Sequence, residues 1–262
     1  MTQSIVVCIH AGKGVSGNLG DGRLTRMITR GFDLLQRRTD RVIIRSRERI
    51  GIKINTIGGR NISTRPETSM ALADWLTRSV SPREIIIWDR SNRELKEAGY
   101  RLDVQSAIKV YGTDSAGAGY ERELVALGQV GSLFSTIQTK AVHASISLAI
   151  LKDHGLAGIT AGMKNYFGAV HNPNKYHDNN CDPYIPEVFS CSPIREKHRL
   201  TVIDALTVQF HRGPAYHARW AEPYGALLFG LDPVATDAVG FSIIEKLRKE
   251  RGLPTLEEEK RA

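Results

Sequence analysis

Short apolar runs rich in β-branched residues alternate along this chain with segments whose apolar residues recur every three or four positions. Runs such as Ser4–His10, Glu84–Trp88 and Arg199–Asp204 are typical of buried strands. Gly22–Arg38 has instead the spacing of an amphipathic helix. Because strands that alternate with helices pack as a mainly parallel sheet with helices on both faces, we predict a three-layer α/β fold.

The remaining elements follow from the same patterns and from turn signals. We predict further strands at Arg41–Arg45, Ile50–Ile54, Leu133–Thr139 and Ala226–Phe229. Helices are predicted from a cap at Thr64 to Arg78, over Ser91–Ala98 and Ser145–Asp153, and after a cap at Asp232. No repeat or linker divides the chain, so we expect a single α/β domain over residues 1–262.

The composition restricts the partners and the stabilising groups. A chain of 262 residues can bury a core without a disulfide or metal. Lysine and arginine number 36 against 28 acidic residues, which favours anionic partners. The three cysteines form no motif for an iron–sulfur cluster. No run of about 20 apolar residues predicts a membrane span. No export signal is visible, so we expect a soluble, cytoplasmic protein unless a signal was removed.

Two features near the N-terminus need an interpretation. The arginines between Arg23 and Arg49 predict a solvated basic face. Nucleic-acid binding is disfavoured, because there is no recognised module and no interleaving of aromatic residues. Gly12–Gly17 matches the G-x-G-x-x-G pattern, but Asn18–Gly22 lengthens the loop and the next predicted strand ends in arginine. We therefore favour a loop that touches an anion through Lys13 over a dinucleotide site.

The segment from Lys164 to Asp182 is rich in side chains that can do chemistry. It holds two histidines, two lysines, a thiol and two aspartates. Gly168 and Pro173 indicate a shaped loop rather than a helix. A long loop in a compact domain is either functional or disordered. Its aromatic residues argue against disorder, so we predict a functional loop over His171–Asp182.

Several residues are candidates for binding or chemistry around this loop. Each Lys-Asn pair can supply both a charge and directional hydrogen bonds. Aspartates at the ends of apolar strands lie where open α/β sheets place ligands, although a capping role would also explain them. The predicted ligand-binding residues are Lys53, Asn55, Asp89, Asn165 and Lys175. The predicted catalytic residues are Lys164, His177 and Asp204.

The loop also has potential metal ligands. His171, His177 and Cys181 have the spacing H-x5-H-x3-C, and His217 lies on a tight turn further along the chain. Imidazole and thiolate ligands suit a divalent ion such as zinc or iron. The spacing matches no standard metal motif, and histidines that bind backbone carbonyls would explain it equally well.

Several short pieces of the sequence resemble the family catalogued as domain of unknown function 362. The matching pieces are Gly51–Asn55, Trp88–Leu95, Gly158–Gly168, His171–Pro183, Val202–Ala205, Gly213-Pro214 and Leu231–Ala235. Many relatives add a ferredoxin-like module, which this chain lacks. The resemblance is to a branch that often carries a twin-arginine export signal, which implies export if a signal was removed. Relatives are also expected to continue beyond Leu253–Glu257, which leaves a clipped C-terminus open.

Three functions are consistent with these patterns. The first is a metal-assisted enzyme that acts on a small anionic substrate at the His171–Asp182 loop. The second is a non-catalytic protein that binds an anionic ligand or cofactor at the same loop. The third, disfavoured above, is a nucleic-acid binder. The sequence fixes neither the substrate nor the oligomeric state.

Overall fold

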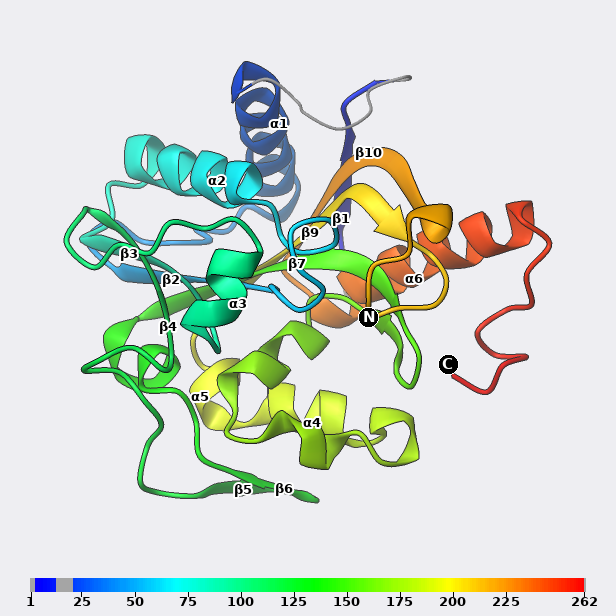
Figure 1. Ribbon diagram of the computed structural model, residues 1–262. Coiled ribbons are helices and arrows are strands. Elements are labelled where there is room, and N and C mark those ends of the chain that lie inside the picture. Colours follow the sequence, from blue (N-terminus) through cyan, green and yellow to red (C-terminus); the bar gives the residue numbers. More distant parts are fainter. Residues whose placement is uncertain (1–2, 13–20, 262) are drawn as a thin grey trace.

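A mixed, mostly parallel sheet forms the centre of the computed structural model, which describes residues 3–12 and 21–261 (Figure 1). Within these residues the strand order is β1-β10-β9-β7-β2-β3-β4, with β8 paired to β7. The strands are β1 (Val6–His10), β2 (Arg49–Ile54), β3 (Glu84–Asp89), β4 (Ile108–Gly112), β7 (Ala144–His154), β8 (Gly158–Thr160), β9 (His198–Gln209) and β10 (Ala221–Gly230). Strands β9, β7, β2, β3 and β4 pair in parallel, and β1, β8 and β10 pair antiparallel. The predicted α/β class is confirmed.

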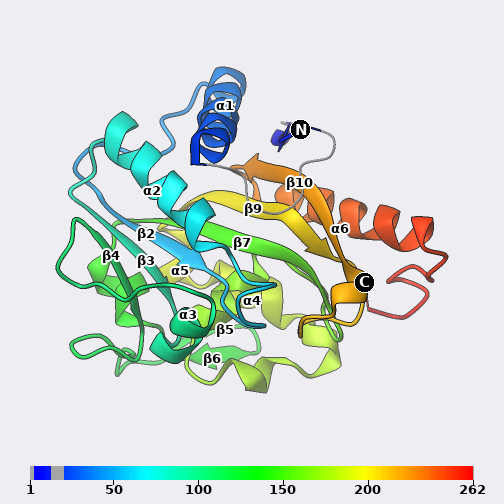
Figure 2. The ribbon, with the colours of Figure 1, turned by 45° about the horizontal axis from the view of Figure 1, so that its top comes forward.

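Helices cover both faces of this sheet (Figures 1 and 2). The helices are α1 (Asp21–Thr39), α2 (Pro66–Ser79), α3 (Asn92–Glu97), α4 (Tyr184–Ser190), α5 (Ser192–Arg195) and α6 (Pro233–Glu250). Alternate residues of one strand enter different cores: Val202 of β9 packs in the cluster with α1 and α2, and Ile203 packs in the cluster with α6. A third cluster joins β3 to α4, α5 and the short helical segments. These opposite cores give the three layers.

Short helical turns make up most of the segment between β8 and α4. They are η2 (Lys164–Ala169), η3 (Pro173–Tyr176) and η4 (Asn179–Cys181). Two more, η1 (Ile137–Ala141) and η5 (Ala218–Trp220), lie elsewhere, as does a small hairpin of β5 (Val125–Leu127) and β6 (Val130–Ser132). The segment predicted as a shaped loop therefore consists largely of short helical turns.

The starts of two helices show which of the predicted capping residues are confirmed. Asp232 caps α6, since its Oδ1 accepts hydrogen bonds from the amides of Val234 (2.9 Å) and Ala235 (3.1 Å). The Thr64 cap was wrong, because α2 begins at Pro66 with Arg65 as its cap residue. Thr64 instead donates its hydroxyl hydrogen to Leu148 O, at 2.9 Å, and so ties the start of α2 to the central strand.

Four predicted elements need correction. Ser145–Asp153 is not a helix but part of β7, and every residue of that strand is buried. A central parallel strand is covered on both faces and has no alternation of polarity, which removes the sequence signal for a strand. Arg41–Arg45 and Leu133–Thr139 form no strands. Ser4–His10 does contain β1, but this is an edge strand with Cys8 exposed.

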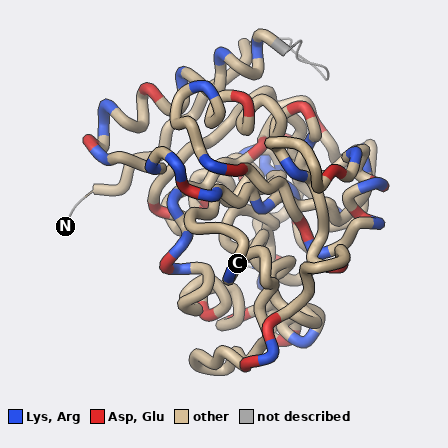
Figure 3. Tube along the Cα trace, turned by 90° about the vertical axis from the view of Figure 1, so that its left-hand side faces the viewer, with Lys and Arg blue, Asp and Glu red and all other residues tan. Residues whose placement is uncertain are grey.

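The charged residues are spread over the surface. Basic and acidic positions are interspersed along the trace (Figure 3), and the arginines of α1 are exposed. Among the described helices, none is long and apolar enough to cross a membrane. Lys13–Gly17 of the glycine-rich motif lies outside the described residues. The three cysteines are unpaired thiols.

Candidate functional site

Three parallel strands end side by side and bring polar side chains to one cavity. Lys53 lies near the end of β2, Asp89 ends β3, and Lys152 and His154 end β7. The carboxyl ends of parallel strands are where α/β proteins bind ligands. Turns η2 and η3 add Lys164, Asn165 and His177. The cavity has a volume of about 220 Å³, and we call it the lysine cavity. Its other lining residues include Asn55, Ile57, Arg90, Glu94, Thr160, Phe167, Gly168, Pro173, Asn174 and Pro214.

Lys53 is fully paired at the base of this cavity. Its Nζ donates to Asp89 Oδ1 (2.7 Å), Ile54 O (2.6 Å) and Asn165 Oδ1 (3.2 Å). Asn165 returns a bond from its Nδ2 to Lys53 O (2.8 Å), and Thr56 donates twice to Asp89 Oδ2. Burial lowers the pKa of Lys53, and the Asp89 carboxylate opposes this effect. A buried ion pair with this many hydrogen bonds is a rigid platform.

Gly168 packs directly against this ion pair. A Cβ at position 168 would lie 2.6 Å from both Lys53 Nζ and Asp89 Oδ1. No real Cβ makes contacts this short, so the backbone of η2 reaches the pair only because residue 168 is glycine. The glycine in the predicted loop therefore serves close approach at the cavity.

Lys152 and Lys164 also bring buried ammonium groups to the cavity, without a carboxylate in ion-pair contact among the described residues. Lys152 Nζ donates to the main-chain oxygens of Ile57 and Ile62. Lys164 Nζ lies 3.3 Å from His177 Nε2, 3.6 Å from Cys181 Sγ and over the Phe167 ring. Burial lowers the pKa of Lys152 to about 7 and that of Lys164 to about 8. The cavity thus holds two buried ammonium groups whose charge is not balanced by a carboxylate in ion-pair contact among the described residues.

Two neutral imidazoles stack beside these amines. The rings of His154 and His177 have centroids 5.6 Å apart. Burial, and then the Lys164 charge, lowers the pKa of both, to about 3 for His154. His154 Nδ1 accepts bonds from the amides of Leu156 and Ala157, so its proton is on Nε2. His177 Nδ1 lies 3.1 Å from Pro173 O and must donate, which leaves Nε2 as an acceptor facing Lys164.

Asn55 supplies an unused acceptor. Its Oδ1 is buried and has no hydrogen-bond partner within the part of the chain that the structure describes. Only 8% of the residue is exposed, and it lines the lysine cavity. A buried acceptor without a donor is costly unless something supplies one. The cavity therefore offers cations for an anion and an acceptor for a hydroxyl or a water molecule.

Three asparagines with left-handed backbone conformation determine the course of the loop between His171 and Asp182. Asn172, Asn179 and Asn180 have positive φ angles of 51°, 46° and 56°. Asparagine tolerates this left-handed conformation better than most residues. Pro173 then starts η3 at the position where a missing amide hydrogen costs least. The asparagines thus shape the loop, which brings His177 to the cavity.

Other predicted residues lie away from the cavity. Lys175 is exposed and donates to Gly131 O (2.6 Å). Asp204 accepts from Thr68 Oγ1 of α2 (2.8 Å) and from the Leu206 amide (3.0 Å), so it braces a helix on the sheet. Burial raises the pKa of Asp204. Neither residue is part of the cavity lining, so the structure does not bring Lys175 and Asp204 together with the other predicted site residues.

The predicted metal ligands do not converge. The His171 ring packs edge-on against Tyr120, with centroids 5.1 Å apart, whereas His177 faces His154 and Lys164. Residue His217 is exposed. Cys181 does lie near His177 through Lys164, but a lysine ammonium between them repels a metal cation. No group of three His, Cys, Asp or Glu side chains suited to a metal occurs among the described residues. The structure therefore does not bring His171, His177, Cys181 and His217 together around one point.

The charged triplet Lys152-Asp153-His154 can be recognised in the sequence as a segment that could converge on the loop, but neither Lys152 nor His154 is assigned a role in the predicted site. The triplet Lys152-Asp153-His154 follows a long apolar run, and a signal was therefore present. Interpreting that run as a strand would have sent Lys152 and His154 to one side and Asp153 to the other. The helix prediction for Ser145–Asp153 concealed this alternation.

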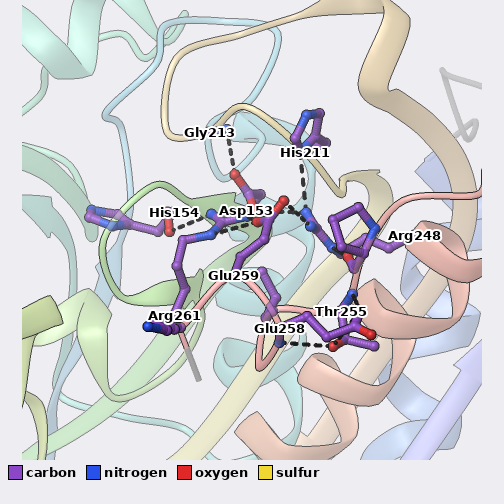
Figure 4. Close-up of polar contacts among 12 residues, drawn as sticks. Asp153, His154, His211, Gly213, Arg248, Thr255, Glu258, Glu259 and Arg261 are labelled. Atoms are coloured by element: carbon purple, nitrogen blue, oxygen red, sulfur yellow. Dashed lines mark hydrogen bonds and ion pairs between the residues drawn. The ribbon is translucent and has the colours of Figure 1, made fainter.

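Asp153 and Arg248 are the buried members of a second group of charges, which also includes the partly exposed Glu259 and Arg261 and which we call the arginine cluster (Figure 4). Its carboxylate lies 2.9 Å from Arg261 Nη1 and 3.6 Å from Arg248 Nη1, and it accepts from the Gly213 amide (2.7 Å). Glu259 lies 2.8 Å from Arg248 Nη2 and also pairs with Arg261. In Figure 4 the His154 ring points away from these arginines. Consecutive residues of β7 therefore serve two different charged groups.

Comparisons with known proteins place the chain in a family without an assigned activity. None of the curated proteins matches it significantly. A solved structure of a Thermotoga maritima protein matches with a TM-score of 0.53 and 10% identity, over 91% of this chain and 61% of that one. This likeness concerns the fold alone, and the single domain over residues 1–262 stays a prediction. The family model described as domain of unknown function (DUF362) matches residues 50–242. The chain belongs to this family, as its sequence pieces predicted.

Proposed function

We propose that the protein binds a small anionic molecule in the lysine cavity and acts on it by proton transfer between the ligand and the Lys164–His177 pair. The observation that carries the proposal is the charge of the cavity. Lys53 is neutralised by Asp89, but Lys152 and Lys164 are buried with no carboxylate in contact among the described residues. A carboxylate or phosphate would supply the missing charge.

The acid-base half of the proposal rests on the Lys164–His177 contact. A general acid or base works best when its pKa lies near the working pH. Burial brings the pKa of Lys164 to about 8, so it holds and releases a proton near neutrality. His177 Nε2 lies 3.3 Å from Lys164 Nζ and accepts that proton. His154, with its proton on Nε2, is a donor for an oxygen of the ligand.

Calorimetric titration with phosphate and with lactate tests the anion site. We expect wild-type protein to bind at least one of the two anions. Lys152→Met and Lys164→Met should each weaken binding about tenfold or more, since one charge-assisted hydrogen bond contributes about 1.5–3 kcal/mol. Lys246→Met is the matched control, because Lys246 is an exposed lysine on α6, paired with Glu250. Equal affinities in all four proteins, or no binding to the wild type, would rule out the site.

A further inference from the structure

The three cavity lysines differ in the acceptors around their amines. Lys53 Nζ donates to three oxygens, and Lys152 Nζ donates to two main-chain oxygens. The neighbours of Lys164 Nζ are an imidazole nitrogen, a thiol sulfur and the Phe167 ring face, 3.8 Å away at its centroid. Among residues 3–12 and 21–261, no oxygen atom accepts a hydrogen bond from this amine. Of the three lysines, Lys164 is therefore the one with its lone pair most readily freed for chemistry.

His177 completes the arrangement that a nucleophilic amine requires. Its Nδ1 proton is fixed on Pro173 O, so Nε2 presents a lone pair toward Lys164 at 3.3 Å. A nucleophile is activated by an adjacent base that is itself oriented by a third group. In this arrangement Pro173 O has the position of the orienting group, His177 that of the base and Lys164 that of the nucleophile. Burial also leaves a usable fraction of Lys164 neutral at physiological pH.

We propose that Lys164 condenses with the carbonyl group of a small oxo acid held in the lysine cavity and forms an imine with it. The inference rests on the proposed function, because the acid group of the ligand would occupy the anion site. Lys152 would bind its carboxylate, and His154 Nε2–H would donate to the carbonyl oxygen. The unpartnered Asn55 Oδ1 fits the hydroxyl of the addition intermediate.

The reaction balances without an oxidant or reductant. The neutral Lys164 nitrogen attacks the carbonyl carbon, and the electron pair of the C=O π bond moves to oxygen. One proton of the nitrogen passes through His177 Nε2 to this oxygen, which gives a carbinolamine. The nitrogen lone pair then forms the C=N bond as the C–O bond breaks, and the second nitrogen proton passes through His177 Nε2 to the departing oxygen, which leaves as water. One amine and one carbonyl thus give one imine and one water.

Reductive trapping tests the proposal. The protein is incubated with pyruvate and sodium cyanoborohydride, and adducts are located by peptide mass spectrometry. We expect one adduct per chain, on Lys164. Lys164→Arg keeps a cation in the cavity but cannot form the imine under these conditions, so it should lose at least about nine-tenths of the trapping while it still binds lactate. Lys246→Met should trap like the wild type.

Lactate separates the two proposals, because it has the carboxylate of pyruvate but no carbonyl. Binding of lactate and pyruvate without an adduct on Lys164 would overturn the imine and leave the anion site standing. Adducts spread over exposed lysines and unchanged in Lys164→Arg would overturn it too. If wild-type protein binds neither anion, both proposals fail. At pyruvate concentrations that saturate the cavity, His177→Gln should slow trapping about tenfold, and an unchanged trapping rate would remove the role of His177 as base.

Discussion

The lysine cavity and the arginine cluster are two groups of buried and partly buried charges at the end of the same strand, and they differ in how those charges are compensated. In the arginine cluster, Arg248 and Arg261 are matched by Asp153 and Glu259 at ion-pair distance. In the cavity, the amines of Lys152 and Lys164 outnumber the carboxylates that touch them. A buried charge with its partners supplied by the chain stabilises structure, whereas one that lacks partners indicates a ligand. We therefore propose a structural role for the arginine cluster on one side of β7 and a ligand-binding role for the cavity on the other.

The largest effect should come from opening the arginine cluster. Arg248 is fully buried and also donates to Pro254 O (2.9 Å) and Phe210 O (3.2 Å). Arg248→Met would leave Arg261 as the one arginine of the cluster for two carboxylates, and would remove the Arg248 donors from Pro254 O and Phe210 O. We expect the free energy of unfolding, measured in urea, to fall by about 3–5 kcal/mol. Lys246→Met should change it by less than about 0.5 kcal/mol. A loss below about 1 kcal/mol for Arg248→Met would show that the cluster is not structural.

The cavity lysines should have the opposite effect on stability, and it should depend on pH. Both have folded-state pKa values, about 7 for Lys152 and about 8 for Lys164, below the ordinary value of 10.5. Between about pH 7 and 10.5 the unfolded chain therefore holds more protons, and the stability of the ligand-free wild type should rise with pH there. The rise should be on the order of 1–3 kcal/mol.

The double variant that combines Lys152→Met and Lys164→Met removes both amines and is the control. The double variant should be more stable than the wild type at pH 6, and its stability should rise less over the same pH range, because Lys53 alone of the three cavity lysines then remains. Urea titrations at several pH values measure both features. If the wild type and the double variant follow parallel pH curves, the cavity amines are already neutralised, and the contrast between the two charge groups disappears.

The smallest effect is expected at Lys175, which the sequence placed in the site and the structure places outside it. Its exposed ammonium binds Gly131 O and not the cavity. Lys175→Met should therefore change the affinity for lactate or phosphate, measured by calorimetry, less than about twofold. A tenfold loss would restore the sequence-based assignment and would mean that the loop moves when an anion binds.

The parts that the sequence predicted well are those with local signals. The Asp232 cap, the apolar run of β3 and the helix over α1 are all encoded in neighbouring residues. The central strand β7 was misassigned, because burial on both faces erases the alternation that marks a strand, and Ile146, Ala149 and Ile150 happen to fit a helical spacing. Pairing partners in β2, β7 and β9 are far apart in the chain, and no local pattern specifies them.

The residues of the candidate site divide in the same way, into those with a local sequence signal and those without one. Lys53, Asn55, Asp89, Lys164, Asn165 and His177 were predicted and do line one cavity. Their polarity at strand ends and in a loop rich in turn residues carried that prediction. His171 was grouped with His177 because they are close in sequence, but the left-handed turn at Asn172 sends the chain elsewhere. The sequence marks the triplet that contains Lys152 and His154, but placing these two side chains together in the cavity required recognising β7 as a strand.

The parallel register between β2 and its neighbours limits which changes in length the chain can tolerate. Lys53 pairs with Trp88 on one side and Ser147 on the other, between Ile52 and Ile54, which face the core under α1 and α2. Deleting or inserting one residue within β2 would exchange the two faces, so that an isoleucine would enter the cavity and the lysine the apolar core. Insertions after the end of β2, in the loop before Pro66, would leave each side chain of the strand on its present face. Changes in length among relatives should therefore fall in such loops, with the spacing inside β2 held fixed.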